Sequence, residues 1–289
     1  MNPLRTIFRY FFLLVFCTLF VFPEFTVEAS TKASEKPEWS GKQDSWHGFK
    51  RFHFEISGRK CYVVTPDQAD PRKPWVWRAR FPNFHDEMDV KLLKQGFHIA
   101  YMDVADLFGS PQAIAAGNKF YDYLTKQHGF QSKVALEGVS RGGLFIYNWA
   151  LANPAKVSCI YADTPVCDFK SWPGGKGKSA GSKPRWEACL KAYGLTEAEA
   201  LAYPNNPVDR IEIIAKAQIP VLHIISENDQ VVPPAENTRL MFSRVPEQYR
   251  KHNFKIISVK QGTEKSKGHH FKHPQPDQVV SFILKNTPK

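Results

Sequence analysis

The chain has 289 residues, of which 43% are hydrophobic and 23% are charged, and its formal net charge is +11. The hydrophobic residues are spread evenly and no linker or internal repeat divides them, so we expect one domain with a large core. Lysine and arginine are scattered and no aromatic RNA-binding motif accompanies them, which argues against nucleic acid as a partner. A solvated charged surface explains the charge most simply, and an anionic polysaccharide is the alternative.

The first 29 residues have the pattern of a secretory signal peptide. Arg5 and Arg9 precede an apolar run from Phe11 to Phe22, and Val27-Glu28-Ala29 provides a small residue at the cleavage site. The rival, a permanent membrane anchor, is disfavoured because a spanning helix needs about 20 apolar residues. We therefore expect a signal at residues 1–29, a domain at residues 30–289, a secreted or periplasmic location, and no stable membrane insertion after signal removal.

Four cysteines follow the signal, an even number that an oxidising compartment would allow to pair in several ways. Cys159 falls within an apolar segment, which indicates a buried thiol. Cys167 and Cys189 flank a glycine-rich stretch that a crosslink would steady, and they are the pair we expect.

Strand-like and helix-like segments alternate through the second half of the chain, a pattern typical of a parallel sheet with crossover helices. The expected strands are residues 51–56, 60–65, 74–79, 97–103, 133–139, 157–161, 220–226 and 254–259. The expected helices are residues 84–95, 111–128, 142–152, 208–217, 235–242 and 278–285. After the sixth strand, residues 166–185 are rich in Gly, Lys, Ser and Pro, which indicates an irregular, lid-like insertion.

The sequence Gly138-Val139-Ser140-Arg141-Gly142-Gly143 lies where an apolar strand leads into a helix. This is the setting of a nucleophile elbow, in which glycines on both sides allow a turn too sharp for side chains. Three fixed positions of Gly and Ser also occur by chance, so the strand and helix around them matter. The motif makes Ser140 the candidate nucleophile.

A serine nucleophile needs a base, and the base needs a carboxylate to orient it. Asp229 follows an apolar strand and is the expected acid, with Glu227 as the fallback and a plain turn aspartate as the alternative interpretation. His269 follows the next strand and directly follows a glycine, so it is the expected base, with His270 and His273 as competitors. The order serine, acid, histidine is that of the α/β-hydrolase fold.

An oxyanion hole requires backbone N–H groups beside the nucleophile. The amide of Arg141, the residue after the serine, is one expected donor, and Ala79 or Arg80, in the loop after the third strand, is the other. A metal site built from His269 and His273 is the structural rival, but Pro274 and the lack of a paired acidic motif argue against it. The expected chemistry requires no metal and no organic cofactor.

Two further side chains are candidates for binding substrate. The Arg141 guanidinium could hold a substrate carboxylate, or it could be an ordinary surface arginine. Trp172, in the lid-like insertion, could stack on a sugar ring.

Taken together, these segments resemble the α/β-hydrolase superfamily over nearly the whole mature chain. The resemblance implies a mostly parallel, eight-stranded sheet with helices on both faces, the serine after the fifth strand, and Ser140, Asp229 and His269 at the triad positions. The elbow also resembles the Gly-Cys-Ser-Arg-x-Gly elbow of glucuronoyl esterases, with Val139 in place of their cysteine.

These features predict a secreted serine esterase that acts on a small-molecule or polysaccharide ester. The basic charge of the protein is compatible with an anionic substrate. Two other classes stay open. A prolyl-oligopeptidase-like peptidase has a similar elbow but usually carries a propeller domain, for which about 260 residues leave no room. The α/β-hydrolase fold is also reused in binding proteins, which typically lose a triad residue.

Overall fold

The structure is a computed structural model that describes Trp39 and residues 41–289. The expected signal peptide at residues 1–29 lies outside the described residues, and so does its boundary with the domain. The described residues fall within one compact unit. In this part of the chain, no helix combines the length and the apolar character that crossing a membrane would require.

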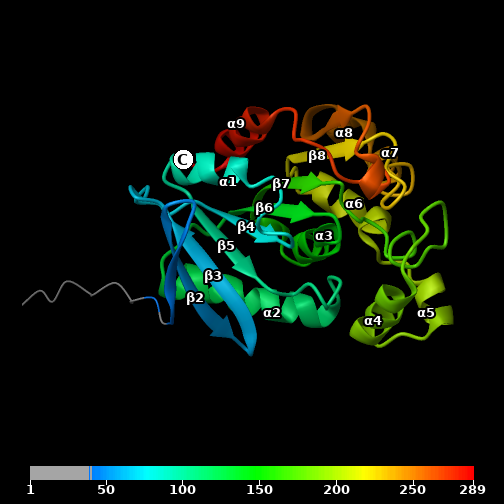
Figure 1. Ribbon diagram of the computed structural model, residues 1–289, viewed down its shortest axis with the longest axis horizontal. Helices are drawn as coiled ribbons and strands as arrows, with labels where there is room; N and C mark the ends of the chain where they lie inside the picture. The colour runs from blue at the N-terminus through cyan, green and yellow to red at the C-terminus, as the bar shows by residue number, and fades with distance from the viewer. Residues whose placement is uncertain (1–38, 40) are drawn as a thin grey trace, which may run out of the picture. The chain divides into compact units, whose positions relative to one another are not determined.

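One nine-stranded sheet organises the described residues (Figure 1). Its strands are β1 Gln43–Trp46, β2 Phe49–Ile56, β3 Arg59–Thr65, β4 Trp75–Ala79, β5 His98–Met102, β6 Val134–Val139, β7 Val157–Asp163, β8 Val221–Ser226 and β9 Phe254–Val259. Their order across the sheet is β1-β2-β3-β5-β4-β6-β7-β8-β9. The pairs from β1 to β5 are antiparallel, and β5-β4-β6-β7-β8-β9 are parallel. The carboxyl ends of the parallel strands therefore meet at one edge.

The sheet contains the eight expected strands and one more, β1, so the elbow follows the sixth strand rather than the fifth. The sequence of β1, Gln43-Asp44-Ser45-Trp46, is short and mostly polar. It pairs only with β2, at the edge of the sheet, where polar side chains remain in water. A four-residue edge strand of this kind carries too little hydrophobic pattern to be recognised in a sequence.

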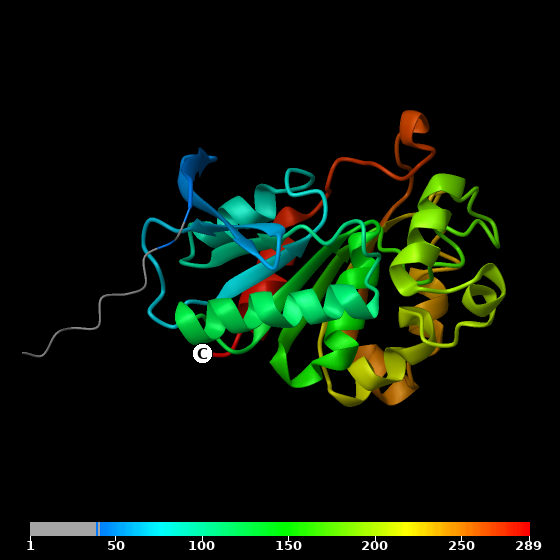
Figure 2. The ribbon, with the colours of Figure 1, turned by 90° about the horizontal axis from the view of Figure 1, so that it is seen from below.

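Helices cover both faces of the sheet, as the sequence predicts (Figures 1 and 2). They are α1 Glu87–Leu93, α2 Pro111–Asp122, α3 Gly142–Ala152, α4 Lys183–Tyr193, α5 Glu197–Ala202, α6 Pro207–Lys216, α7 Thr238–Ser243, α8 Glu247–Asn253 and α9 Pro276–Asn286. Helices α2, α3, α6 and α7 contribute apolar side chains to the core on one face, and α1 and α9 do so on the other. Burial on both faces explains why the central strands read as nearly continuous apolar runs.

The insertion between β7 and α6 is more ordered than its composition suggests. Its first part is irregular, but α4 and α5 follow, and the sequence predicts neither helix. Thr196 and Glu199 cap α5 reciprocally, each side chain accepting a hydrogen bond from the backbone N–H of the other residue. Phe169 and Trp186 pack in a separate hydrophobic cluster there, which also includes Phe108. The insertion is therefore a packed subdomain.

The expected disulfide between Cys167 and Cys189 is wrong, because the four described cysteines are all free and buried. Cys167 belongs to the large hydrophobic core, whereas Cys189 lies in the separate cluster of the insertion. Cys159 is buried in β7, as the sequence predicts. Burial raises the pKa of Cys189 to about 12, so this thiol stays protonated and unreactive.

A buried ionic group ties the central strands to α1. The guanidinium of Arg78, on β4, donates to Asp89 of α1 at 2.7 Å and to Glu137 of β6 at 2.8 Å. All three side chains are almost fully buried. Burial raises the pKa of both acids, that of Glu137 well above its ordinary value. The group fixes the strand that leads to the elbow.

Candidate active site

Ser140 stands on a sharp turn between β6 and α3. Its backbone has φ of 51°, in the left-handed region that side chains rarely adopt. A Cβ on Gly142 would lie 2.3 Å from the carbonyl oxygen of Ala79, and one on Gly138 would lie 2.5 Å from Cδ1 of Ile146. Gly142 is thus required by close packing against the backbone, whereas a side chain at Gly138 would have to displace the end of Ile146.

Asp229 lies in the loop after β8, where its carboxylate is held by the backbone. Oδ1 accepts hydrogen bonds from the N–H groups of Val231 at 2.8 Å and Val232 at 2.9 Å. The residue is only 4% exposed. Because Oδ1 is occupied, Oδ2 is the oxygen that faces the histidine.

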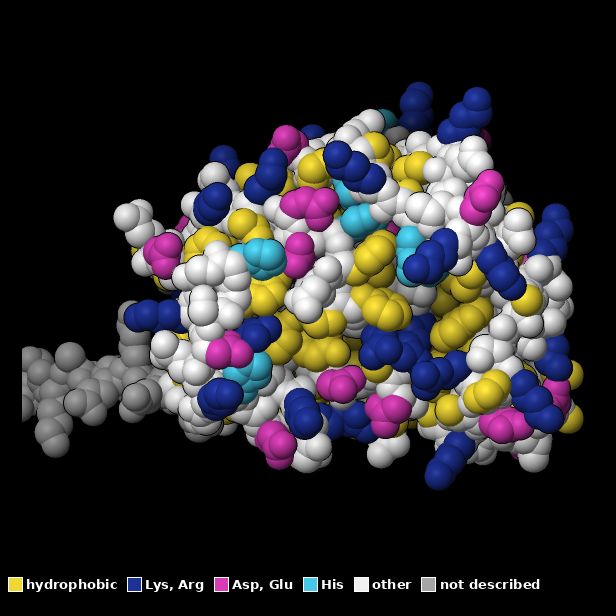
Figure 3. Space-filling model, in the orientation of Figure 1, with side chains coloured by type: hydrophobic (Ala, Val, Ile, Leu, Met, Phe, Trp, Pro, Cys, Tyr) yellow, Lys and Arg dark blue, Asp and Glu magenta, His cyan; other side chains and the backbone are white. Residues whose placement is uncertain are grey.

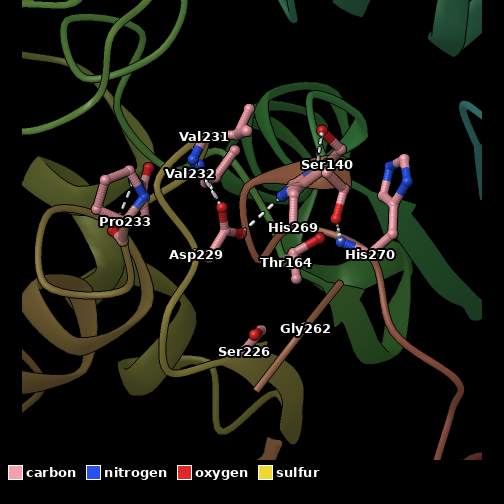
Figure 4. A network of polar contacts seen from close by, with 12 residues as sticks. Ser140, Thr164, Ser226, Asp229, Val231, Val232, Pro233, Gly262, His269 and His270 are labelled. Atoms are coloured by element: carbon pink, nitrogen blue, oxygen red, sulfur yellow. Dashed lines mark hydrogen bonds and ion pairs between the residues drawn. The ribbon is translucent and has the colours of Figure 1, made fainter. Parts of the chain in front are cut away.

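His269 lies between Asp229 and Ser140 (Figure 4). Its Nδ1–H donates to Asp229 Oδ2 at 2.6 Å, and its Nε2 accepts from the Ser140 hydroxyl at 3.0 Å. The histidine is 7% exposed and the serine 9%. The structure therefore brings the expected nucleophile, base and acid into one hydrogen-bonded chain that can move a proton from serine to histidine.

The competing side chains are directed elsewhere. The ring of His270 is exposed and points away from Asp229 in Figure 4. His273 is buried, and its Nε2 bonds the Tyr161 hydroxyl at 3.0 Å. Burial lowers the pKa of His273. Glu227, the fallback acid, is exposed and pairs with Arg239 at 2.5 Å.

The loops that carry the acid and the base are joined by their backbones. The Gln230 N–H donates to the Lys267 carbonyl at 3.0 Å. Gly268 has φ of 84°, and a Cβ there would lie 2.2 Å from the Asn228 carbonyl oxygen. Only glycine allows so close an approach. The Asn228 side chain adds a further link, because its Oδ1 accepts the Gly262 N–H at 2.8 Å.

A second histidine–carboxylate pair, absent from the sequence predictions, lies beside the first. His85 Nδ1 donates to Asp163 Oδ2 at 2.5 Å, and its Nε2 donates to the carbonyl of Phe271 at 2.6 Å. Burial alone would lower the pKa of His85, but the bond to Asp163 and its negative charge outweigh burial and raise it. Both ring nitrogens face acceptors, which favours the protonated form of His85, and the two bonds brace the loop carrying His269. The position of Asp163 at the carboxyl end of β7 is the one signal that the sequence offers.

The residues expected at the oxyanion hole adjoin the elbow. Ala79 pairs in register with Gly138, and its carbonyl faces Gly142. Arg141 follows Ser140 at the start of α3. Trp172 is half-buried in the insertion, with its ring 6.4 Å from that of Phe108. Phe108 in turn lines a narrow cavity together with Arg141. Among the described residues, no group of three or more His, Cys, Asp or Glu side chains could hold a metal ion.

No protein-family model matches the sequence, and no curated protein matches it. Solved structures match over most of the chain. A puromycin hydrolase shares 15% identity with a TM-score of 0.58, over 85% of this chain and 38% of that one. An acylaminoacyl peptidase from Pyrococcus horikoshii shares 14% identity with a TM-score of 0.59, over 83% and 42%. An esterase from Pyrococcus furiosus shares 15% identity with a TM-score of 0.54, over 85% and 97%.

These similarities establish the fold: the chain has the α/β-hydrolase fold. It spans well under half the length of the puromycin hydrolase and the acylaminoacyl peptidase, and nearly the full length of the esterase. The neighbours include both esterases and peptidases, so the fold alone does not determine the bond that is cleaved.

Proposed function

We propose that this protein is a serine hydrolase in which Ser140, His269 and Asp229 form the catalytic triad. The hydrogen-bonded chain of the three side chains carries the proposal. Each side chain comes from a different loop at the carboxyl edge of the sheet, where enzymes of this architecture keep their sites. Such convergence of nucleophile, base and acid is uncommon in a protein without catalysis.

In the proposed reaction, Ser140 Oγ attacks an ester carbonyl while its proton passes to His269 Nε2. Asp229 holds the imidazole and stabilises its positive form, and the amide of Arg141 donates to the oxyanion. As the carbon–oxygen bond breaks, His269 returns the proton to the leaving alcohol. Water, deprotonated by His269, then attacks the acyl-enzyme, and the proton passes back to Ser140 as the acid is released.

For the substrate, we propose a carboxylic ester on a carbohydrate. The Ser-Arg elbow, similar to that of glucuronoyl esterases, supports this class, as does an aromatic side chain, Trp172, in the neighbouring insertion. Secretion is part of the same proposal. A peptidase activity is the second candidate, favoured by the acylaminoacyl peptidase among the structural neighbours.

The test is hydrolysis by the mature protein of short acyl esters, a methyl-esterified uronic acid, an acetylated polysaccharide and a prolyl peptide amide. We expect Ser140→Ala to lower kcat on the cleaved substrate by a factor of about 10⁴ or more. Ser158, on β7, is also a buried serine, and Ser158→Ala is the matched control. That variant should keep its activity. Near-wild-type turnover by Ser140→Ala would exclude the mechanism, and cleavage of the peptide alone would favour a peptidase.

The base is tested by comparing three alanine variants. His269→Ala should lower kcat by orders of magnitude, because it removes the proton acceptor that Ser140 contacts. His270→Ala should have little effect, since its ring points away from the site. His273→Ala should act mainly through stability, because it removes the bond to Tyr161. A larger loss of turnover in either of the last two variants would contradict the assignment.

A further inference from the structure

An open pocket lined by basic side chains lies next to the elbow. Its volume is about 470 Å³, and its lining includes five cations and two carboxylates: Arg59, Lys60, Arg80, Arg141, Arg185, Asp103 and Asp106. Arg185 comes from α4 of the insertion, whereas Arg80 follows β4 and Arg141 follows the serine. Figure 3 shows Lys and Arg side chains gathered near the middle of one face, in the region over α2 and α4 of Figure 1.

Three of these arginines have no acidic partner. No ion pair joins Arg80, Arg141 or Arg185 to a carboxylate within the described residues. Arg80 Nε and Arg141 Nη1 are buried and have no hydrogen-bond partner there. An unpaired buried N–H costs about 1–3 kcal/mol, and more when the group is charged. Such groups in a native structure call for a bound partner or a functional reason.

Three other charged side chains of the pocket already have partners, and Lys60 is exposed. Arg59 donates to Asp106 at 2.9 Å and to the backbone carbonyl of Asp103 at 2.9 Å. The Asp103 carboxylate accepts the N–H of Ala105 at 3.2 Å. Arg80, Arg141 and Arg185 are therefore the arginines of the pocket that have no carboxylate partner among the described residues.

Arg141 is the most confined of the three. It is 8% exposed, and its guanidinium carbon lies 5.8 Å from the centre of the Phe108 ring. Burial, together with the nearby charges of Arg80 and Arg185, lowers its pKa to about 10. Three like charges around one space repel one another, and an anion placed between them relieves that repulsion.

The pocket adjoins a narrow cavity beside the elbow. The narrow cavity lined by Tyr101, Phe108 and Phe145 shares Arg80, Ala105 and Arg141 with it. Because Arg141 directly follows Ser140, a substrate whose scissile bond lies at Ser140 has the cationic pocket close by.

We propose that Arg80, Arg141 and Arg185 bind a carboxylate of the substrate, so that the protein prefers esters that carry a negative charge near the scissile bond. This inference rests on the proposed serine hydrolase activity. Guanidinium groups bind a carboxylate through paired N–H donors, which fixes its orientation as well as its charge. Because Arg185 lies on the insertion, a bound substrate carboxylate would also link the insertion to the elbow.

Two substrate pairs test the proposal. Monobenzyl succinate and benzyl succinamate differ by a carboxylate on the acyl side, and 4-carboxybenzyl acetate and 4-carbamoylbenzyl acetate differ by one on the alcohol side. For at least one pair, we expect kcat/KM to favour the anionic member by about tenfold or more. Arg185→Gln should reduce this preference by about three- to tenfold. Lys183→Gln, an exposed cation on the same helix outside the pocket, should leave it unchanged.

The ratio within a pair corrects for any general loss of activity, since both members use the same triad. Equal kcat/KM within both pairs, or a preference that Arg185→Gln does not change, would overturn the carboxylate site while leaving the hydrolase intact. Loss of all activity in Ser140→Ala would support the proposed triad and would not test the carboxylate site.

A binding measurement does not depend on turnover. We expect calorimetry to show saturable binding of succinate to the Ser140→Ala protein, and weaker binding when Arg185→Gln is added. No saturable binding of succinate, or binding of inorganic sulfate in its place, would overturn the assignment of the pocket to a carboxylate.

Discussion

Gly142 shows how strictly the elbow is packed, because its missing side chain is what allows β4 to approach the start of α3. We expect Gly142→Ala to lower kcat/KM by about 10- to 100-fold, since displacement of Ala79 and the elbow by a fraction of an ångström misaligns the serine. Overpacking should also lower the free energy of unfolding by about 1–3 kcal/mol. Ester hydrolysis and urea unfolding measure the two effects.

The control for this substitution is Gly194→Ala, at the end of α4. Gly194 has φ of 66°, but a Cβ there would meet nothing within 4 Å. That variant should lose about 1 kcal/mol of stability and keep its activity. Equal activity of the two variants would mean that close packing at the elbow does not control the serine's position.

At the residue scale, the triad could be anticipated because each member follows an apolar strand in the order that the fold demands. The choice of His269 over His270 and His273 depended only on the glycine before it, since three histidines within five positions differ in which way the loop turns them. The pairing of His85 with Asp163 joins residues 78 positions apart, and the sequence signals it only through the position of Asp163 at the carboxyl end of a strand.

At the scale of secondary structure, Arg78 joins three elements through two buried acids. We expect Arg78→Met to destabilise the protein by about 3–5 kcal/mol, because Asp89 and Glu137 would keep their burial without a counter-charge. Urea unfolding measures the effect, and expression only in aggregated form would be consistent with it. Arg51→Met, which removes a partly exposed pair with Asp44, is the matched control and should cost about 1 kcal/mol or less. Equal losses would contradict the role of Arg78.

The elements themselves were predictable where both faces of a strand or one face of a helix are apolar. Strands β4, β6, β7 and β8 are buried along their whole length, so their apolar runs stand out. The exposed helix α8, with no buried residue, lacks such a pattern and was missed. In the insertion, α4 begins at Lys183-Pro184-Arg185 directly after a glycine-rich stretch. The composition of that stretch indicates irregular structure, so the sequence does not show where the helix begins.

For the whole molecule, buried neutral histidines make stability depend on pH. Burial lowers the pKa of His98 to about 4 and that of His223 to about 3, below the ordinary 6.5. Between these values and pH 6.5, the two histidines are therefore protonated in the unfolded chain and neutral in the folded chain. The stabilisation is complete above about pH 6.5 and is lost as pH falls toward the folded pKa values, by about 1.4 kcal/mol per pH unit for each histidine.

Urea unfolding between about pH 6.5 and pH 5, above the titration of most carboxylates, measures this slope. His98→Gln should reduce the slope by about 1.4 kcal/mol per pH unit, whatever its effect on absolute stability. His252→Gln, at an exposed histidine of α8, should not change it. Parallel profiles for the wild type and His98→Gln would refute the assignment of the slope to His98.

The backbone link between Gln230 and Lys267, and the contact of Gly268 with Asn228, align Asp229 with His269 without any help from Ser140. This matters in the second half of the proposed reaction, when the serine is esterified and no longer offers the histidine a proton. The contacts between the two loops then keep the His269 imidazole in the same orientation. An incoming water therefore finds Nε2 still positioned to accept its proton.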